Sequence, residues 1–402
     1  MERTERVGLG TIAAQWGRIG LLGFGGPPAH ILLLRRLCVE QRGWLEPDEF
    51  EDGIAATNLL PGPASTQLAV LTAWRLRGTP GALVGGFCFI APGLVLILAL
   101  SALFLAGHPP LWVLGAAAGA GAAVPAVAAQ AATSLIPGSF TRAGRERRAR
   151  VRWAGYALAG AVAAILTGPW LVLVLVTAGL AEIAARARSR ARTRDGDGDG
   201  DGTGGRRAPL PPAAVLPVLP VAGGLAGLGA VAWVAFKVGA LSYGGGFVII
   251  PLMQDDAVHR YHWMTDGQFL NAVALGQVTP GPVVHTVAAV GYAAAGVGGG
   301  LLAAAVAFAP SFLFVLLGAR HFDRLRADRR VQDFLTGAGP AVIGAIAGSA
   351  VPLAAALGRG WQWGVLAGAL LWLVAARRGV VLTLLAAGGA GVLAVLAGLP
   401  PA

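Results

Sequence analysis

The stretch NLLPGPASTQLAVLTAW, from Asn58 to Trp74, decides the fold. It is apolar enough for the interior of a membrane, yet it carries Pro61-Gly62-Pro63, a tripeptide that would break a helix. Non-helical backbone survives at membrane depth only where protein buries it or where it lines a cavity. The stretch therefore predicts a broken helix or a re-entrant hairpin rather than a plain membrane span.

The composition of the chain predicts an all-α polytopic membrane protein. Of its 402 residues, 55% are hydrophobic and 13% are charged, whereas a soluble domain has roughly 25% charged residues. Apolar runs such as 81–106 and 111–136 exceed the length of about 20 residues that a membrane-spanning helix needs, and we expect about 10 to 13 membrane segments. These runs lack the alternation of β-barrel strands.

A second Pro-Gly-Pro tripeptide indicates that the chain contains an internal repeat. It lies at Pro280-Gly281-Pro282, 219 residues after the first. The same spacing aligns several pairs of similar residues: Arg18 with Lys237, Gly25-Gly26 with Gly244-Gly245, Trp44 with Trp263, and Asn58 with Gln277. We therefore expect an N-terminal membrane repeat over 1–185, a charged flexible linker over 186–209 and a C-terminal membrane repeat over 210–402.

The positions of the arginines predict that the two repeats have inverted topology. The basic loop over 142–152 corresponds to a stretch with only Arg359, and the basic loop over 320–330 corresponds to a stretch near His108 without Lys or Arg. Basic loops remain in the cytoplasm, so equivalent loops should lie on opposite sides of the membrane, as in many secondary transporters. The linker is then cytoplasmic and the C-terminus lies outside.

The two breaks are candidates for an anion site. A helix that begins at Pro63 or Pro282 presents free N–H groups and the positive end of its dipole. Arg18 and Lys237 each interrupt an apolar run without an acidic residue nearby. Because a charge in the membrane costs roughly 2.5–3.5 kcal/mol, we expect an anionic ligand as their partner. The alternative is that both side chains extend to the membrane surface.

The candidate substrate-binding residues lie at the glycine-rich openings and around the breaks. In the first half they are Arg18, Gly25, Gly26, His30, Asn58, Pro61, Gly62, Pro63, Ser65, Thr66 and Gln67. In the second half they are Lys237, Gly244, Gly245, Gly246, Gln277, Pro280, Gly281, Pro282 and His285. Asn58 and Gln277 could donate to an oxyanion or could cap carbonyls freed by the break. For His30, a structural role is the alternative.

Several other functions find no support in the sequence. Cys38 and Cys88 indicate neither a disulfide framework nor a metal site, and no cofactor is expected. The spans contain no nucleophile–base pair and no paired carboxylates, so an enzyme is not expected. The basic clusters are typical of cytoplasmic loops and not of a nucleic-acid-binding surface. The expected partners are an oxyanion and the lipid bilayer, with a homodimer left open.

The motifs resemble those of the chromate ion transporter family. The resemblance rests on FGGPPAH at Phe24–His30, on NLLPGPASTQLA, and on LSYGGGFVIIPLM and HWMTDGQFLNAVALGQVTPGPV in the second half. It covers both halves, as in the long-chain, two-domain type. It implies a secondary transporter in the plasma membrane of a bacterial-type cell that exports chromate and so gives chromate resistance. Sulfate is the chemically similar competitor.

The charge of chromate is compatible with export. Each charge that crosses a membrane is worth about 2.3 kcal/mol per 100 mV, so a dianion leaving an inside-negative cell gains roughly 4–5 kcal/mol per 100 mV. Two alternatives remain at this point: a transporter of sulfate or another oxyanion, and a channel-like anion pathway.

Overall fold

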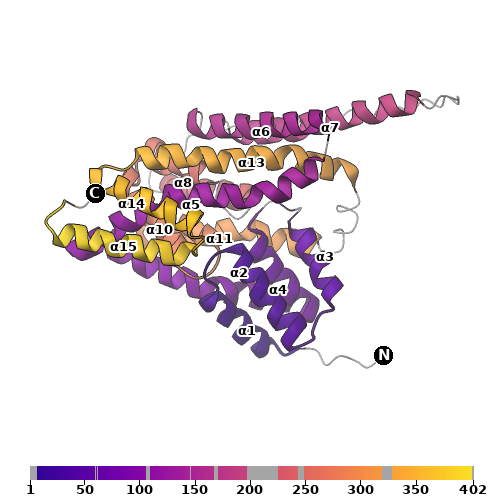
Figure 1. The fold of residues 1–402 in the computed structure, drawn as a ribbon. Coiled ribbons are helices and arrows are strands. Elements are labelled where there is room, and N and C mark those ends of the chain that lie inside the picture. Colours follow the sequence, from indigo (N-terminus) through magenta and orange to yellow (C-terminus); the bar gives the residue numbers. More distant parts are fainter. Residues whose placement is uncertain are drawn as a thin grey trace.

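The structure is a computed structural model that describes residues 7–58, 60, 62–105, 109–144, 146–166, 171–196, 225–242, 249–318 and 328–400. Within these ranges every regular element is a helix (Figure 1). The expected all-α fold is confirmed.

The helices follow one another without strands in the described ranges. Those of the first half are α1 (Leu9–Leu22), α2 (Pro27–Arg35), the π-helix η1 (Arg36–Gln41), α3 (Pro47–Thr57), α4 (Ala64–Phe104), α5 (Leu111–Ala143), α6 (Arg147–Leu166) and α7 (Leu171–Gly196). Those of the second half are α8 (Leu225–Leu241), α9 (Ile250–Gln254), the π-helix η4 (Asp255–Arg260), α10 (Asp266–Val278), the 3₁₀ turn η5 (Val283–His285), α11 (Thr286–Gly318), α13 (Arg329–Ala355), α14 (Gly360–Leu370), the π-helix η7 (Leu371–Ala375) and α15 (Val380–Leu396).

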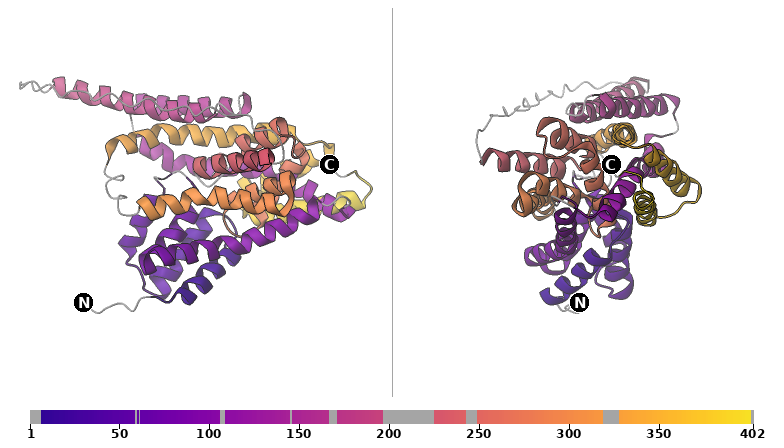
Figure 2. Two further views of the ribbon diagram at one scale, coloured as in Figure 1. Left: turned by 180° about the vertical axis from the view of Figure 1, so that it is seen from behind. Right: turned by 90° about the vertical axis from the view of Figure 1, so that its left-hand side faces the viewer.

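The helices have the length and apolarity of a multi-pass membrane protein. Among the described residues, four helical stretches are long and apolar enough to cross a membrane, namely α4, α5, α13 and the stretch Val283–Gly318 formed by η5 and α11. Shorter apolar helices cover Gly227–Leu241, Gly360–Ala375 and Val380–Leu396. The long helices run roughly along one common direction (Figures 1 and 2). The expected total of about 10 to 13 membrane segments remains a prediction.

α4 and α11 are each folded back on themselves. The reversal in α4 is at Gly78 and that in α11 is at Gly296, both with φ of 62°, a conformation that glycine adopts without steric cost. A Cβ added at Gly81 would lie 2.3 Å from the carbonyl oxygen of Ala73, whereas eight residues of straight helix span about 12 Å. Each element is therefore a hairpin of two helical arms, as expected for a chain with broken helices.

The backbone repeats its irregular features at the spacing found in the sequence. The π-helices η1 and η4 start 219 residues apart, at Arg36 and Asp255. Gly62 and Gly281 both have positive φ, of 115° and 96°. These recurrences support two related halves, and their inverted orientation stays a prediction.

The last helices of each half pack against the long helix of the other half. α6 and α7 pack along α13, while α14 and α15 pack along α5. In Figures 1 and 2, α6 and α7 lie beside α13 along one edge of the bundle. A Cβ added at Gly344 would lie 1.7 Å from the Ala157 carbonyl oxygen, and one at Gly119 would lie 2.1 Å from that of Ala387. Small residues of this kind let membrane helices approach closely enough to associate.

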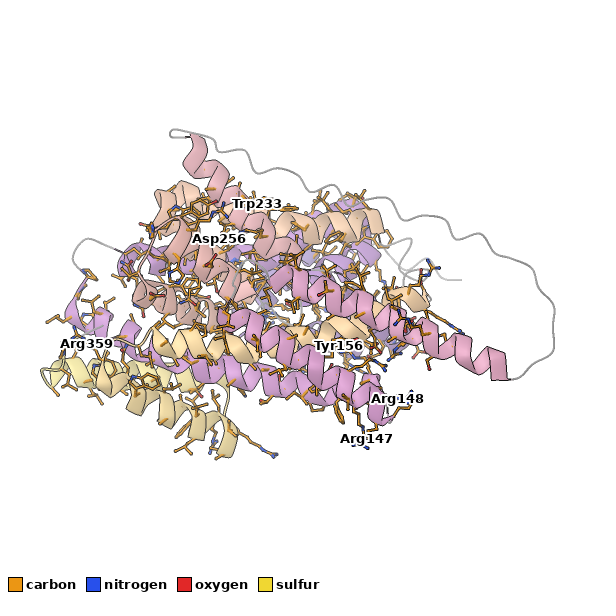
Figure 3. The ribbon with its side chains drawn as sticks, turned by 90° about the horizontal axis from the view of Figure 1, so that it is seen from above. Arg147, Arg148, Tyr156, Trp233, Asp256 and Arg359 are labelled. Atoms are coloured by element: carbon orange, nitrogen blue, oxygen red, sulfur yellow. The ribbon has the colours of Figure 1, made fainter. Side chains whose placement is uncertain are left out.

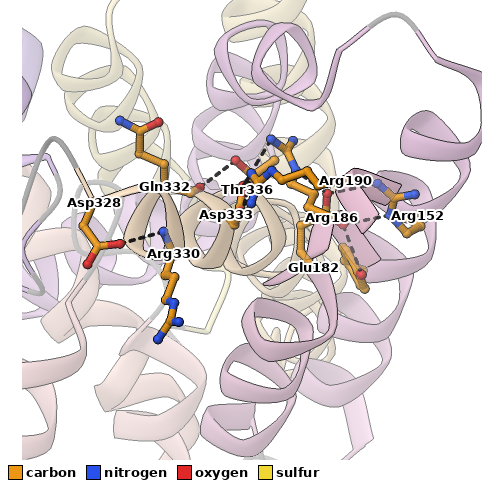
Figure 4. Close-up of polar contacts among 10 residues, drawn as sticks. Arg152, Glu182, Arg186, Arg190, Asp328, Arg330, Gln332, Asp333 and Thr336 are labelled. Carbon is orange, nitrogen blue, oxygen red and sulfur yellow. Dashed lines mark hydrogen bonds and ion pairs between the residues drawn. The ribbon is translucent and has the colours of Figure 1, made fainter. Parts of the chain in front are cut away.

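The first residues of the predicted linker are helical, because α7 continues past residue 186 to Gly196. Arg186 Nε lies 2.8 Å from a carboxylate oxygen of Glu182, and Arg190 Nη2 lies 2.8 Å from one of Asp333 on α13 (Figure 4). A buried carboxylate requires such cationic partners. These arginines, which have the composition of a linker, therefore belong to the packed helices. Residues 197–209 of the predicted linker lie outside the described residues.

The contact between α6 and α13 yields a stability prediction. Gly344→Ala should lower the melting temperature of the detergent-solubilised protein, because overpacking a tight contact costs about 1–3 kcal/mol. Gly155→Ala on α6 is the matched control, since a Cβ there meets nothing within 4 Å and alanine favours the helix. Equal melting temperatures for both variants would contradict this packing.

Candidate functional site

A cavity of about 680 Å³ lies between the two halves, large enough for a small ligand. Both halves contribute to its wall. The lining residues are Gly25, Gly26, Pro27, Pro28, Ile31, Thr57, Asn58, Leu60, Gly62, Ala64, Val127, Gln130, Ala131, Ser134, Leu135, Gly138, Ser139, Arg142, Gln277, Val283, Gly339, Val342, Ile343, Gly379 and Val380.

Four helix N-termini meet at this cavity. The first residues of α2, α4, η5 and α15 line it, which are Pro27, Ala64, Val283 and Val380. Each N-terminus carries a partial positive charge, and those of α4, η5 and α15 also offer free N–H groups, which α2 lacks because it begins with Pro27-Pro28. The C-termini of α3 and α10 reach the same wall and bring two carboxamides, Asn58 and Gln277. The last turn of α5 also lines the wall, so helix N-termini and C-termini are mixed there. The free N–H groups at the starts of α4, η5 and α15 are what favours a negatively charged ligand.

Each break is held by the other half of the chain. The backbone N–H of Gly62 donates to the Ser242 carbonyl at the end of α8, at 2.8 Å. The N–H of Gly281 donates to the Gly23 carbonyl at the end of α1, at 3.0 Å. The two bonds are equivalent at the spacing of 219 residues. They satisfy backbone groups that could not remain unpaired within a membrane.

Five of the predicted binding residues line the cavity: Gly25, Gly26, Asn58, Gly62 and Gln277. Gln277 is 8% exposed, and its Nε2 group has no hydrogen-bond partner among the described residues. A buried donor without a partner costs about 1–3 kcal/mol. An oxyanion in the cavity would accept from this donor, which makes Gln277 the strongest single candidate.

Nine predicted residues are buried behind the wall and do not line the cavity: His30, Pro63, Ser65, Thr66, Gln67, Pro280, Gly281, Pro282 and His285. Pro63 and Pro282 each cap the helix that follows the break instead of occupying its first position. The His30 Nε2 group donates to the Gly23 carbonyl at 2.8 Å. His30 therefore donates to the same Gly23 carbonyl that accepts from Gly281 at the second break. This contact corresponds to the structural role given above as the alternative for His30.

Neither predicted cation reaches the cavity. Arg18 is exposed on α1 and is absent from the wall. Lys237 forms an ion pair with Asp256 on η4, and its Nζ lies 5.9 Å from the centre of the Trp233 ring. Figure 3 shows Trp233 and Asp256 close together. The prediction that Lys237 has no acidic partner is wrong, because Asp256 comes 19 residues later and only the fold brings it near.

Pro61, Gly244, Gly245 and Gly246 lie outside the described residues.

The sequence analysis missed the contribution of α5. Its residues Gln130, Ser134, Ser139 and Arg142 line the cavity. Gln130 and Ser134 share one face of the helix, whereas Ser139 and Arg142 lie about 180° and 120° around the helix from Gln130. Polar residues recurring in the second half of an otherwise apolar helix were the available signal. Arg142 is the one charged residue in the described wall. Arg142 lies just before Arg147 and Arg148 in the chain. Figure 3 shows that Arg147 and Arg148 lie far from Arg359.

Comparisons with known proteins show which proteins the chain resembles. The family model described as "Chromate transporter" matches residues 10–183 and 229–392. The chromate transport protein of Cupriavidus metallidurans is 32% identical over 345 residues, which cover 84% of this chain and 80% of that protein. The chromate transport protein of Pseudomonas aeruginosa is 31% identical over 362 residues, 85% of this chain and 80% of that protein. No solved structure matches the chain.

The ion pair of Lys237 yields a prediction about stability. Lys237→Met should destabilise the protein by about 3–5 kcal/mol, because it leaves the buried Asp256 carboxylate without its main partner. The double variant Lys237→Met/Asp256→Asn should recover most of the lost melting temperature. Arg18→Met, at the equivalent exposed position, is the control and should have little effect. A double variant as unstable as Lys237→Met alone would show that the pair is not the cause.

Proposed function

Because the chain belongs to the chromate transporter family, we propose that it is a secondary transporter that exports chromate from the cytoplasm and so gives resistance to chromate. The observation that carries the proposal is the cavity between the halves, where four helix N-termini and the unpaired donor of Gln277 meet. Chromate is a tetrahedral dianion whose oxygens accept hydrogen bonds from every side.

The wall suits recognition of this anion by neutral donors. The Gln277 amide and the Asn58 amide come from opposite halves, and the Gln130 amide adds a third donor from α5. The Ser134 hydroxyl already donates to the Ala131 carbonyl at 2.7 Å. Oriented N–H groups and helix ends stabilise an anion in a site from which much of the water is excluded. We place the bound anion among these groups, with Arg142 attracting it from one end of the cavity.

The side on which the cavity lies supports export. Its α5 residues belong to the C-terminal half of that helix and end at Arg142, next to the basic start of α6. Basic loops stay in the cytoplasm, so the cavity receives its anion from the cytoplasm, and the linker lies on the same side. The inverted halves then supply a second state that opens outwards, with the C-terminus on that side. The membrane potential favours the outward movement of a dianion.

A second candidate substrate is sulfate or another tetrahedral oxyanion. The donors of the described wall are neutral apart from Arg142, and such donors recognise shape and charge rather than the central atom. Competition between the anions is therefore the decisive comparison.

Transport in vesicles tests the proposed function. Inside-out vesicles that contain the protein should accumulate chromate when their interior is made positive, and uptake should saturate with chromate concentration. Sulfate in excess should compete if the site accepts it. Uptake no faster than in vesicles without the protein would contradict the proposed transport of chromate. Uptake that rises linearly with chromate concentration, without saturation, would indicate a channel-like pathway.

Binding to Gln277 gives a separate prediction. Gln277→Leu should raise the Kd for chromate about tenfold or more, because a hydrogen bond to a charged group is worth about 1.5–3 kcal/mol. The melting temperature should not fall, since the amide Nε2 has no partner among the described residues. Equilibrium dialysis of the purified protein measures the Kd, with the exposed Gln41→Leu as control. An unchanged Kd would remove Gln277 from the site.

A further inference from the structure

A second, much smaller polar pocket lies where the end of α4 meets α10. Its volume is about 20 Å³, roughly the room that one water molecule needs. Three polar side chains line it, namely Ser101, Gln268 and Asn271, and no carboxylate does so in the described part of the chain. The cavity described above does not include any of these residues.

The polar residues of this pocket become more buried from its mouth inwards. Gln268 is exposed, Asn271 is half-buried and Ser101 is fully buried. The Ser101 hydroxyl at the inner end has no hydrogen-bond partner within the described ranges. A buried hydroxyl without a partner is unfavourable, so the pocket ends at a group suited to a polar ligand.

α10 connects this pocket with the cavity. Gln268, Asn271 and Leu275 lie on the face of α10 that borders the pocket, and Gln277 borders the cavity. The six residues from Asn271 to Gln277 span about 9 Å of helix. Gln277 lies about 200° around the helix from Leu275, so α10 itself separates the pocket from the cavity in this closed state. Leu275 is 9% exposed, and Gly276 packs directly against Thr286.

The pocket and the cavity lie toward opposite ends of α5. The Asn271 Oδ1 atom would lie 2.8 Å from a Cβ added at Gly121, whereas the cavity ends at Arg142 on the same helix. The cavity borders α5 from Val127 to Arg142, so its nearer end lies six residues, about 9 Å of helix, from Gly121 and its far end about 30 Å away.

We propose that this pocket is the closed exit end of the transport path, a site for the tetrahedral oxyanion after it leaves Gln277. This inference rests on the proposed function. When the protein opens on the side away from Arg142, the anion moves past Leu275, and Asn271 and Ser101 donate hydrogen bonds to its oxygens. In α3, the residues equivalent to Gln268 and Asn271 are the acidic Glu49 and Asp52. Of these two helices, α10 is therefore the one with a neutral face along which an anion can move.

Accessibility of single cysteines tests the path. In a chain carrying Cys38→Ala and Cys88→Ala, Ser134→Cys reports on the cavity and Asn271→Cys on the pocket. A membrane-impermeant maleimide should label Ser134→Cys from the Arg142 side, and chromate should slow that labelling. It should label Asn271→Cys from the opposite side only. Saturating chromate under a membrane potential should raise that rate about threefold or more, as expected when a minor open state becomes populated.

Gly267→Cys is the matched control, because it lies on α10 and a Cβ there meets nothing within 4 Å. It should be labelled from the same side as Asn271→Cys at a rate that chromate does not change. If chromate protects Ser134→Cys while Asn271→Cys is labelled from the Arg142 side, or does not respond to chromate, the exit path is wrong and the proposed function stands. If chromate does not protect Ser134→Cys, the proposed function itself is contradicted.

A second variant tests the hydroxyl without altering the shape of the pocket. Ser101→Ala should lower the maximal rate of chromate transport about tenfold, the loss expected when a hydrogen bond to a charged group disappears. The Kd for chromate at the cavity should not change. An unchanged maximal rate would overturn the assignment of Ser101 to the path.

Discussion

The fold depends on the need to hydrogen-bond every backbone group within a membrane. The two Pro-Gly-Pro breaks interrupt their helices, and glycine at positive φ turns the chain at Gly62 and Gly281. The N–H groups exposed by these turns are satisfied by carbonyls of the opposite half, at Ser242 and Gly23. The breaks, the ends of α1 and α8, and the starts of the following helices therefore form one bonded unit. This unit brings helix N-termini to the cavity wall.

The outer helices of each half also pack against the opposite half. α6 and α7 cover α13 of the second half, and α14 and α15 cover α5 of the first. Glycines such as Gly344 and Gly119 allow these helices to approach at backbone distance. The ion pair between Arg152 on α6 and the buried Glu182 on α7 holds these two helices together, and Arg186 pairs with the same carboxylate within α7 (Figure 4). The cavity is the space left between two long helices that are each supported from outside by the other half.

The sequence predicted the helical class, the breaks and part of the site because these depend on local chemistry. A Pro-Gly-Pro tripeptide in an apolar run is compatible with few backbone conformations. The repeat identified Asn58 and Gln277 as a pair. Contacts between residues far apart in the chain could not be predicted from the sequence. The acidic partner of Lys237 lies on a separate π-helix. The role of Arg142 depends on which face of α5 meets the second half, and a linker-like run of arginines forms a helix through its contacts with α13.

The reciprocal hydrogen bonds at the breaks also bear on how such a chain could be divided. A polypeptide that carried one half alone would leave the N–H of its glycine turn without the carbonyl that now accepts from it. It would also expose the face of its long helix that foreign helices now cover. Such a half would need a second chain beside it before it could close its own site. The smallest unit that satisfies both breaks is therefore a pair of halves, whether these are joined by a linker or encoded separately.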